Sequence, residues 1–123
     1  MCGGILLALV DRLEMPPHQV ILSSFNHDWL RQAQALRPDI EVRALIGYLP
    51  FVPLDWGDLS FATYNALSTL ITEGKIREVT ARGIALNLFT VNEIADMRRF
   101  VDAGVTGLFT DFPQRLVNLE QRP

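Results

Sequence analysis

The sequence has few of the residues from which several common kinds of site are built. Cys2 is the only cysteine among 123 residues, which excludes an internal disulfide framework and any cysteine-based metal site. One cysteine is typical of a reducing compartment, so we expect a cytoplasmic location. The net charge is -3, and no basic stripe is interleaved with aromatic residues. The electrostatic signature of a nucleic-acid-binding protein is therefore missing.

No apolar run is long enough to cross a bilayer, so we expect no membrane span. The first segment, "MCGGILLALVDRLEMPP", lacks the basic start of a signal peptide, and its apolar run breaks at Asp11 and Arg12. Apolar residues at helical spacing from Leu6 to Leu13 predict a helix instead. This helix begins without a clear cap, which is how a truncated domain would begin.

Apolar runs alternate with amphipathic segments along the rest of the chain. Apolar residues make up 49% and charged residues 20%, which indicates one globular domain over residues 1–123. The apolar runs predict strands at 19–25, 40–49, 59–65, 84–91 and 105–111. The segments between them predict helices at 26–37, 66–82, 92–104 and 113–122. This alternation predicts an α/β fold with a parallel sheet.

Capping residues mark the ends of the predicted helices. Asn26 is expected to be an N-cap, and Pro38 stops the same helix. Asn92 has two available roles, as the N-cap of the helix that it begins and as a hydrogen-bond donor into the cleft, and we expect the cap. Gly83 and Gly104 take the positions after helix ends, where a left-handed backbone favours glycine.

Two architectures satisfy this alternation. One is an open, doubly wound sheet of five strands. The other is five consecutive strands of a (β/α)8 barrel, whose closed form needs about 200 residues or more. Periodicity does not choose between them. In both, function lies at the carboxyl ends of the strands.

Polar and aromatic residues at the predicted strand ends are the candidate site residues. They are Ser23, Ser24, Phe25, Gly47, Tyr48, Tyr64, Asn65, Phe89, Thr90, Asn92, Thr110 and Asp111. Asp111 is the one carboxylate among them, whereas a metal held by carboxylates normally needs two or more. We expect Asp111 to cap the turn into the last helix.

Other catalytic patterns are weak or missing. His27 follows the first strand without a partner acid, and we interpret it as a partly exposed loop histidine. The serines lack the Gly-x-Ser-x-Gly elbow, and small hydroxyl groups at strand ends usually bond the backbone. The glycines lack the dinucleotide fingerprint. The aromatic residues either line an apolar pocket or pack in the core; they are Phe25, Tyr48, Trp56 and Phe89.

Three segments resemble a known family in order and spacing. "ILSSFNHDWL", "GIALNLFTVNE" and "AGVTGLFTDFP" resemble the later segments of glycerophosphodiester phosphodiesterases, and the similarity runs from Val20 to Leu116. This family, which acts in lipid and glycerol metabolism, has a (β/α)8 barrel. It hydrolyses glycerophosphodiesters to glycerol 3-phosphate and an alcohol with a divalent cation, usually Ca²⁺ or Mg²⁺. The resemblance implies a partial (β/α)8 TIM barrel of about five consecutive parallel strands with intervening helices.

The resemblance also implies which site residues are present. The family's His-Arg-Gly, Glu-x-Asp, His-Asp and Glu-x-Lys motifs precede its Ser-Phe strand, and none occurs ahead of that strand here. No catalytic residue and no cation ligand therefore carries over. Phe25 and Phe89 are implied as walls of the substrate pocket, with Phe89 where the family commonly has tryptophan. Ser24, Asn92 and Asp111 are implied as supporting residues.

We therefore predict the C-terminal portion of a phosphoric diester hydrolase, inactive as this chain alone. Its partner in the complete enzyme would be a small-molecule glycerophosphodiester. One alternative is a non-catalytic half-barrel that associates with another chain through open sheet edges. Another is a small, open-sheet, flavodoxin-like binding domain, whose strand order would run out and back from the first strand.

Overall fold

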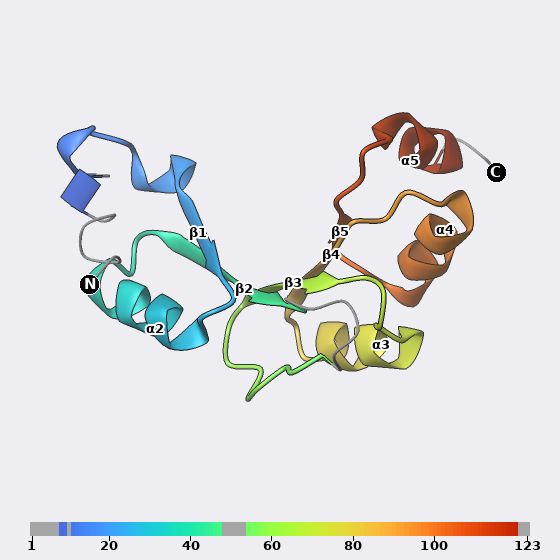
Figure 1. Ribbon diagram of the computed structural model, residues 1–123, viewed down its shortest axis with the longest axis horizontal. Coiled ribbons are helices and arrows are strands. Elements are labelled where there is room, and N and C mark those ends of the chain that lie inside the picture. Colours follow the sequence, from blue (N-terminus) through green and yellow to red (C-terminus); the bar gives the residue numbers. More distant parts are fainter. Residues whose placement is uncertain (1–7, 10, 48–53, 121–123) are drawn as a thin grey trace. The chain divides into compact units, whose positions relative to one another are not determined.

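The computed structural model describes residues 8–9, 11–47 and 54–120 (Figure 1). The chain divides into two compact units, Met1–Leu45 and Ile46–Pro123. Among the described residues, no helix combines the length and apolar character that crossing a membrane requires.

The first unit is a pair of parallel strands joined by a helix. Its elements are the 3-10 helix η1 (Pro17–Gln19), strand β1 (Ile21–Ser24), helix α2 (His27–Leu36) and strand β2 (Glu41–Ile46), which reaches the boundary of the unit. β1 and β2 pair in parallel, and α2 packs on β1. Leu22 and Val42 are buried together with Leu30 of the helix, so alternate strand residues form the core beneath α2.

Local signals set the ends of α2 as predicted. The Asn26 side chain accepts a hydrogen bond from the backbone N–H of Trp29 at 3.1 Å, which confirms the N-cap. The helix ends at Leu36, and Arg37 precedes Pro38 in a non-helical conformation, as expected of a residue before proline.

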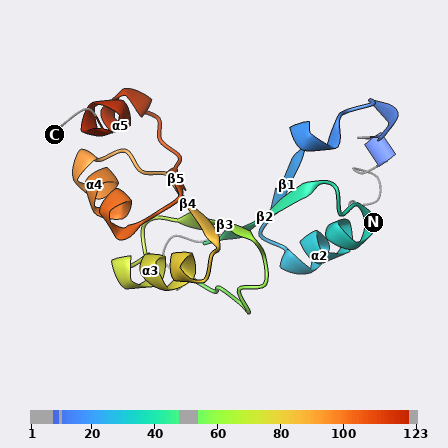
Figure 2. The same cartoon turned by 180° about the vertical axis from the view of Figure 1, so that it is seen from behind.

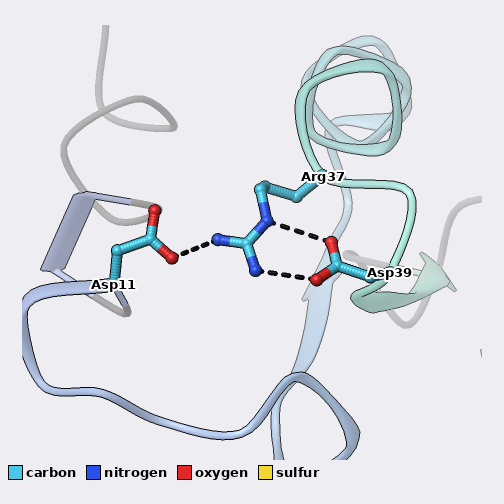
Figure 3. A network of polar contacts seen from close by, with 3 residues as sticks. All are labelled: Asp11, Arg37 and Asp39. Atoms are coloured by element: carbon cyan, nitrogen blue, oxygen red, sulfur yellow. Dashed lines mark hydrogen bonds and ion pairs between the residues drawn. The ribbon is translucent and has the colours of Figure 1, made fainter.

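A three-residue polar network follows α2 (Figure 3). The Arg37 guanidinium donates two hydrogen bonds to Asp39, at 3.0 and 2.8 Å, and also contacts the carboxylate of Asp11. These bonds raise the pKa of Arg37 above its usual value and lower the pKa of Asp39. The network therefore ties the segment before β1 to the end of α2.

The second unit contains three parallel strands in sequential order, β3-β4-β5. Its elements are β3 (Thr63–Leu67), α3 (Glu73–Ala81), β4 (Ala85–Phe89), α4 (Ile94–Ala103), β5 (Gly107–Leu108) and α5 (Pro113–Glu120). Seen from either side, the three helices follow one another in chain order along the strands (Figures 1 and 2), and α3 packs on β4 and α4.

The core of the second unit lies between these strands and helices. Leu86 and Leu88 of β4 are 0% exposed, whereas Asn87 and Phe89 between and after them are partly exposed. This period of two marks a strand with one fully covered face. The helices contribute Ile76, Val79, Met97 and Phe100 to the core. Burying each of these side chains stabilises the unit by about 1.5–3 kcal/mol relative to leaving it exposed.

A row of three residues crosses the strands of this unit. Asn65, Asn87 and Gly107 are register partners. The Asn87 amide donates to Asn65 Oδ1 at 3.0 Å, which satisfies a side chain that is only 6% exposed. A Cβ atom at Gly107 would lie 2.6 Å from Asn87 Oδ1. The row therefore requires glycine on β5.

The boundary between β3 and α3 differs from the prediction. β3 continues to Leu67, and α3 begins at Glu73 after Thr72, whose Oγ1 accepts from Lys75 N at 3.2 Å. The helix expected from residue 66 is therefore wrong over its first turns. Apolar residues at 67, 70 and 71 imitated a helical face, but pairing of Leu67 with Phe89 extends the strand.

The remaining elements occur where the alternation predicted them, although the strands are shorter. Gly83 and Gly104 follow α3 and α4 with positive φ angles of 81° and 100°, which confirms both as glycines at helix ends. Pro113 opens α5 as expected. Of the predicted N-terminal helix, residues 8–9 and 11–12 are helical. Residues 6, 7 and 10 of that prediction, and the end of the strand predicted at 40–49, lie outside the described residues.

Candidate functional site

The carboxyl ends of β3, β4 and β5 meet at one edge of the second unit because the strands are parallel. We call this the carboxyl edge, and it comprises Ser68, residues 89–92 and residues 109–112, with Arg115 from α5. Hydrogen bonds connect all of these segments.

Asn92 and Asp111 are joined by two hydrogen bonds at this edge. Asn92 Oδ1 accepts from the backbone N–H of Asp111 at 3.0 Å and from the Thr110 hydroxyl at 3.1 Å. Asn92 Nδ2 donates to the Asp111 carboxylate at 3.1 Å. The prediction that Asn92 caps α4 is wrong, since Glu93 is the N-cap and makes no side-chain cap bond. Asn92 instead matches both the donor and the acceptor of Asp111.

Asp111 was expected to cap the turn into the last helix. Its carboxylate accepts from Asn92, and the hydroxyl of Thr110 accepts from the backbone N–H of Phe112 at 3.0 Å. The turn into α5 therefore uses the threonine, which leaves the aspartate bonded across the two strand ends.

Arg115 closes the same network from α5. Its Nη1 donates to the backbone carbonyl of Asn92 at 2.7 Å, and its guanidinium carbon lies 4.1 Å from the ring centroid of Phe112. Arg115 has no distinguishing signal in the sequence, because it is one of several polar residues of an amphipathic helix.

Ser68 fixes the end of β4 from the other side. Its backbone N–H donates to the Phe89 carbonyl at 2.8 Å, and its hydroxyl donates to the Thr90 carbonyl at 3.1 Å. The Phe89–Thr90 peptide bond is cis. Ser68 was missed because the predicted strand ended at Asn65; the signal that would have found it is the cap Thr72, which places residues 68–71 outside the helix.

In the first unit, the candidate residues follow β1. Ser24 Oγ accepts from the backbone N–H of Asn26 at 3.0 Å, which confirms the expectation that small hydroxyl groups bond the backbone. Phe25 is 41% exposed, so it does not belong to the buried core. His27 is the first residue of α2 rather than a loop residue, and its Nε2–H donates to the Leu45 carbonyl at 2.9 Å.

The other aromatic candidates are core residues or lie outside the described chain. Trp56 is 9% exposed and its ring centroid lies 6.0 Å from that of Tyr64, while Lys75 Nζ lies 5.5 Å from the Trp56 ring. Trp56 is therefore part of the core, which was one of the two predictions for it, the other being the lining of an apolar pocket. Tyr64 lies inside β3 rather than at its end. Tyr48 is not among the described residues.

Parallel strands in sequential order, joined by helices and carrying polar groups at their carboxyl ends, define an α/β protein of the barrel-forming type. The profile of the glycerophosphoryl diester phosphodiesterase family matches residues 4–115, and the chain belongs to this family.

Curated relatives agree with this assignment. The chain is 29% identical over 102 residues to the glycerophosphodiester phosphodiesterase of Bacillus subtilis (strain 168), with 79% of this chain and 35% of the relative covered. It is 30% identical over 110 residues to the glycerophosphodiester phosphodiesterase of Caldanaerobacter subterraneus, with 85% and 43% covered. The chain thus spans well under half the length of these relatives.

Solved structures share the fold. A structure from Silicibacter pomeroyi aligns with a TM-score of 0.75 and 26% identity over 95% of this chain and 43% of that one. A phosphodiesterase from Oleispira antarctica, solved with its product sn-glycerol-3-phosphate, aligns with a TM-score of 0.75 and 22% identity over 98% of this chain and 50% of that one. The prediction of a partial barrel is therefore confirmed over the flavodoxin-like alternative.

The residues that the structure describes do not fit the divalent cation that the family implies. Within residues 8–9, 11–47 and 54–120, no three histidine, cysteine, aspartate or glutamate side chains gather as a metal site requires. At the carboxyl edge, Asp111 is exposed and its carboxylate is bonded to an amide.

Proposed function

We propose that this chain is the C-terminal portion of a glycerophosphodiester phosphodiesterase, which hydrolyses a glycerophosphodiester to glycerol 3-phosphate and an alcohol. The observation that carries the proposal is the bonded set of Asn92, Thr110 and Asp111. It joins two of the three segments on which the resemblance rests, "GIALNLFTVNE" and "AGVTGLFTDFP", at the edge where a barrel carries its active site. The product bound to the Oleispira antarctica phosphodiesterase supports the reaction class.

In this proposal the chain contributes to substrate binding rather than to bond cleavage. Hydrolysis of a phosphodiester needs a base for the attacking water and an acid for the leaving alcohol, and we assign no residue of this chain to either role. Phe25 and Phe89 form apolar walls for the glycerol moiety, and Ser24, Asn92 and Asp111 hold the surrounding loops. We assign the ligands of the Ca²⁺ or Mg²⁺ ion to the rest of the complete enzyme. We place the enzyme in the cytoplasm, because a single cysteine is typical of proteins in a reducing compartment.

The first test uses the purified chain with glycerophosphocholine and Ca²⁺ or Mg²⁺. We expect no turnover above the blank. Turnover by the chain alone would contradict the assignment of all catalytic groups to the rest of the enzyme.

The second test adds the part of the enzyme to which the proposal assigns the catalytic groups. We define the joined protein as the segment of the Caldanaerobacter relative that lies ahead of its matched 110 residues, followed by this chain. We expect the joined protein to hydrolyse glycerophosphocholine, and neither part alone to do so. A joined protein that melts cooperatively but has no activity would overturn the proposed function.

A second candidate function is a half-barrel that associates with another chain through its sheet. The observation in favour is that two large apolar side chains are exposed at β1. Ile21, in the strand, is 48% exposed, and Phe25, which follows the strand, is 41% exposed. Sedimentation of the chain decides this point. A concentration-dependent dimer is expected if the sheet is an interface, whereas a monomer at all concentrations contradicts it.

A further inference from the structure

Ser68 makes two hydrogen bonds to successive carbonyl groups of one short segment. β3 ends at Leu67, opposite Phe89 in the sheet register. The Ser68 backbone N–H reaches the Phe89 carbonyl at 2.8 Å, as the next rung of the ladder would. The hydroxyl then reaches the Thr90 carbonyl at 3.1 Å. The side chain thus continues the pairing one residue beyond the end of β4.

The same segment is held on its far side by the residue that follows β5 and by α5. The Val91 backbone N–H donates to the Phe109 carbonyl at 2.8 Å, and Arg115 donates to the Asn92 carbonyl at 2.7 Å. Val91 is buried, whereas Thr90 is exposed. The carbonyl group of the exposed Thr90 is therefore fixed by its hydrogen bond from the Ser68 hydroxyl.

The direction of the Phe89 ring depends on the backbone of this segment, because a side chain adopts rotamers that its own φ and ψ allow. Phe89 is partly exposed at the end of β4, so packing encloses it less than Leu86 or Leu88. The hydrogen bond from Ser68 to the Thr90 carbonyl therefore has more influence on the orientation of the Phe89 ring than it would have on a fully packed core side chain.

We infer that Ser68 is a positioning residue for the substrate: its hydroxyl fixes the Phe89–Thr90 segment and thereby the apolar wall that Phe89 presents to the glycerol moiety. This inference rests on the proposed function. Because Ser68 acts through the wall and not on the phosphorus, its loss weakens binding of substrate and transition state alike. Such a loss raises KM and leaves kcat nearly unchanged.

The test compares Ser68→Ala with Ser68→Thr, which keeps a hydroxyl, in the joined protein. With glycerophosphocholine, Ser68→Ala is expected to raise KM about threefold to tenfold, the effect of one neutral hydrogen bond, with kcat within about twofold. With bis(p-nitrophenyl) phosphate, which has no glycerol moiety, KM should not change. Ser68→Thr should restore the original KM. The matched control is Thr80→Val, which removes a hydroxyl that bonds the Ile76 carbonyl within α3 at 2.8 Å.

A second measurement separates this inference from the proposed function. In the chain alone, Ser68→Ala should speed amide hydrogen exchange at Val91, whose N–H is bonded to Phe109, while Ser68→Thr and Thr80→Val should not. If the joined protein with Ser68 intact has no activity, the proposed function fails and exchange alone decides whether Ser68 positions the segment. Unchanged exchange at Val91 overturns the positioning role. An equal loss of kcat/KM for both substrates overturns the link to the glycerol wall.

Discussion

At Gly107 the sheet of the second unit has no room for a side chain. Asn87 Oδ1 lies where a Cβ atom would approach to 2.6 Å, and the same amide group bonds the buried Asn65. The sequence showed a glycine in the strand "VTGLFTD" but not its reason, because the reason is a contact with a residue twenty positions away. Contacts of this kind become visible only once the register is known.

Gly107→Ala is expected to destabilise the chain by about 1–3 kcal/mol, since Asn87 must move and its bond to Asn65 weakens. Urea unfolding measures the change. Gly74→Ala is the matched control, because Gly74 lies in the first turn of α3 with its nearest contact at 4.0 Å from the added Cβ. An equal effect at both positions would contradict the contact with Asn87.

Asn92 is the other residue whose partners define its role. Asn92→Asp keeps the shape but replaces the donor to Asp111 with a second carboxylate. Because this bond is exposed, we expect a loss of about 0.5–1.5 kcal/mol at pH 7. Like charges raise the pKa of one carboxyl group in the folded state, so stability should recover as the pH falls through that raised pKa.

The partner substitution provides the control. In the double variant Asn92→Asp with Asp111→Asn, donor and acceptor exchange places, and part of the lost stability should return. Additive losses in urea unfolding at pH 7 would show that the two side chains do not interact.

At the scale of elements, alternation of apolar runs was enough to predict the order of strands and helices. It was not enough to place every boundary. The sequence 66–71 has apolar residues at helical spacing, yet pairing with β4 makes Ala66 and Leu67 strand. Likewise Asn92 is a residue type that commonly caps helices, but its side-chain amide bonds Asp111 after the next strand instead of the first turn of α4. Tertiary contacts decided both cases.

The two helices of the second unit with assigned caps allow a direct comparison. Thr72 caps α3 through its hydroxyl, so Thr72→Ala should cost about 0.5–2 kcal/mol. Glu93 occupies the cap position of α4 without a side-chain bond, so Glu93→Ala should change stability by less than about 0.5 kcal/mol. Thermal unfolding of both variants checks this; a larger loss at Glu93 would contradict the assigned caps.

The ion pair between Arg37 and Asp39, which follows α2, predicts a pH dependence. Arg37 lowers the pKa of Asp39 below its usual 3.8, so this pair stabilises the first unit above about pH 4 and loses that effect as the pH falls through the lowered pKa. Asp39→Asn should therefore be less stable than the unchanged chain at pH 7, and the difference should shrink as the pH falls through the lowered pKa. A difference that does not shrink on acidification would have another cause.

At the scale of the whole molecule, the family was predictable because its motifs fall on strand ends that the alternation already marked. The roles of single residues were less accessible. Ser68 and Arg115 each bond a backbone carbonyl, and carbonyl partners leave no pattern in the sequence.

Because the proposed function assigns the cation ligands to the rest of the complete enzyme, we expect that the cation does not stabilise this chain. Adding millimolar Ca²⁺ or Mg²⁺, or a chelator, should leave its Tm unchanged, because a ligand that does not bind the folded state cannot raise Tm. The joined protein should melt at a higher temperature with the cation than with chelator. A shift in the chain alone would place cation ligands within it.

The bond between Asn92 and Asp111 also concerns how such proteins are recognised. Two short motifs, nineteen positions apart, are usually counted as two independent pieces of information about kinship. Here the two motifs are joined by a hydrogen bond between their side chains, so we expect the two positions to covary. A lineage that replaces the amide is expected to replace the carboxylate as well. A sequence that retains one of the two residues and changes the other would then mark an edge that has been rebuilt.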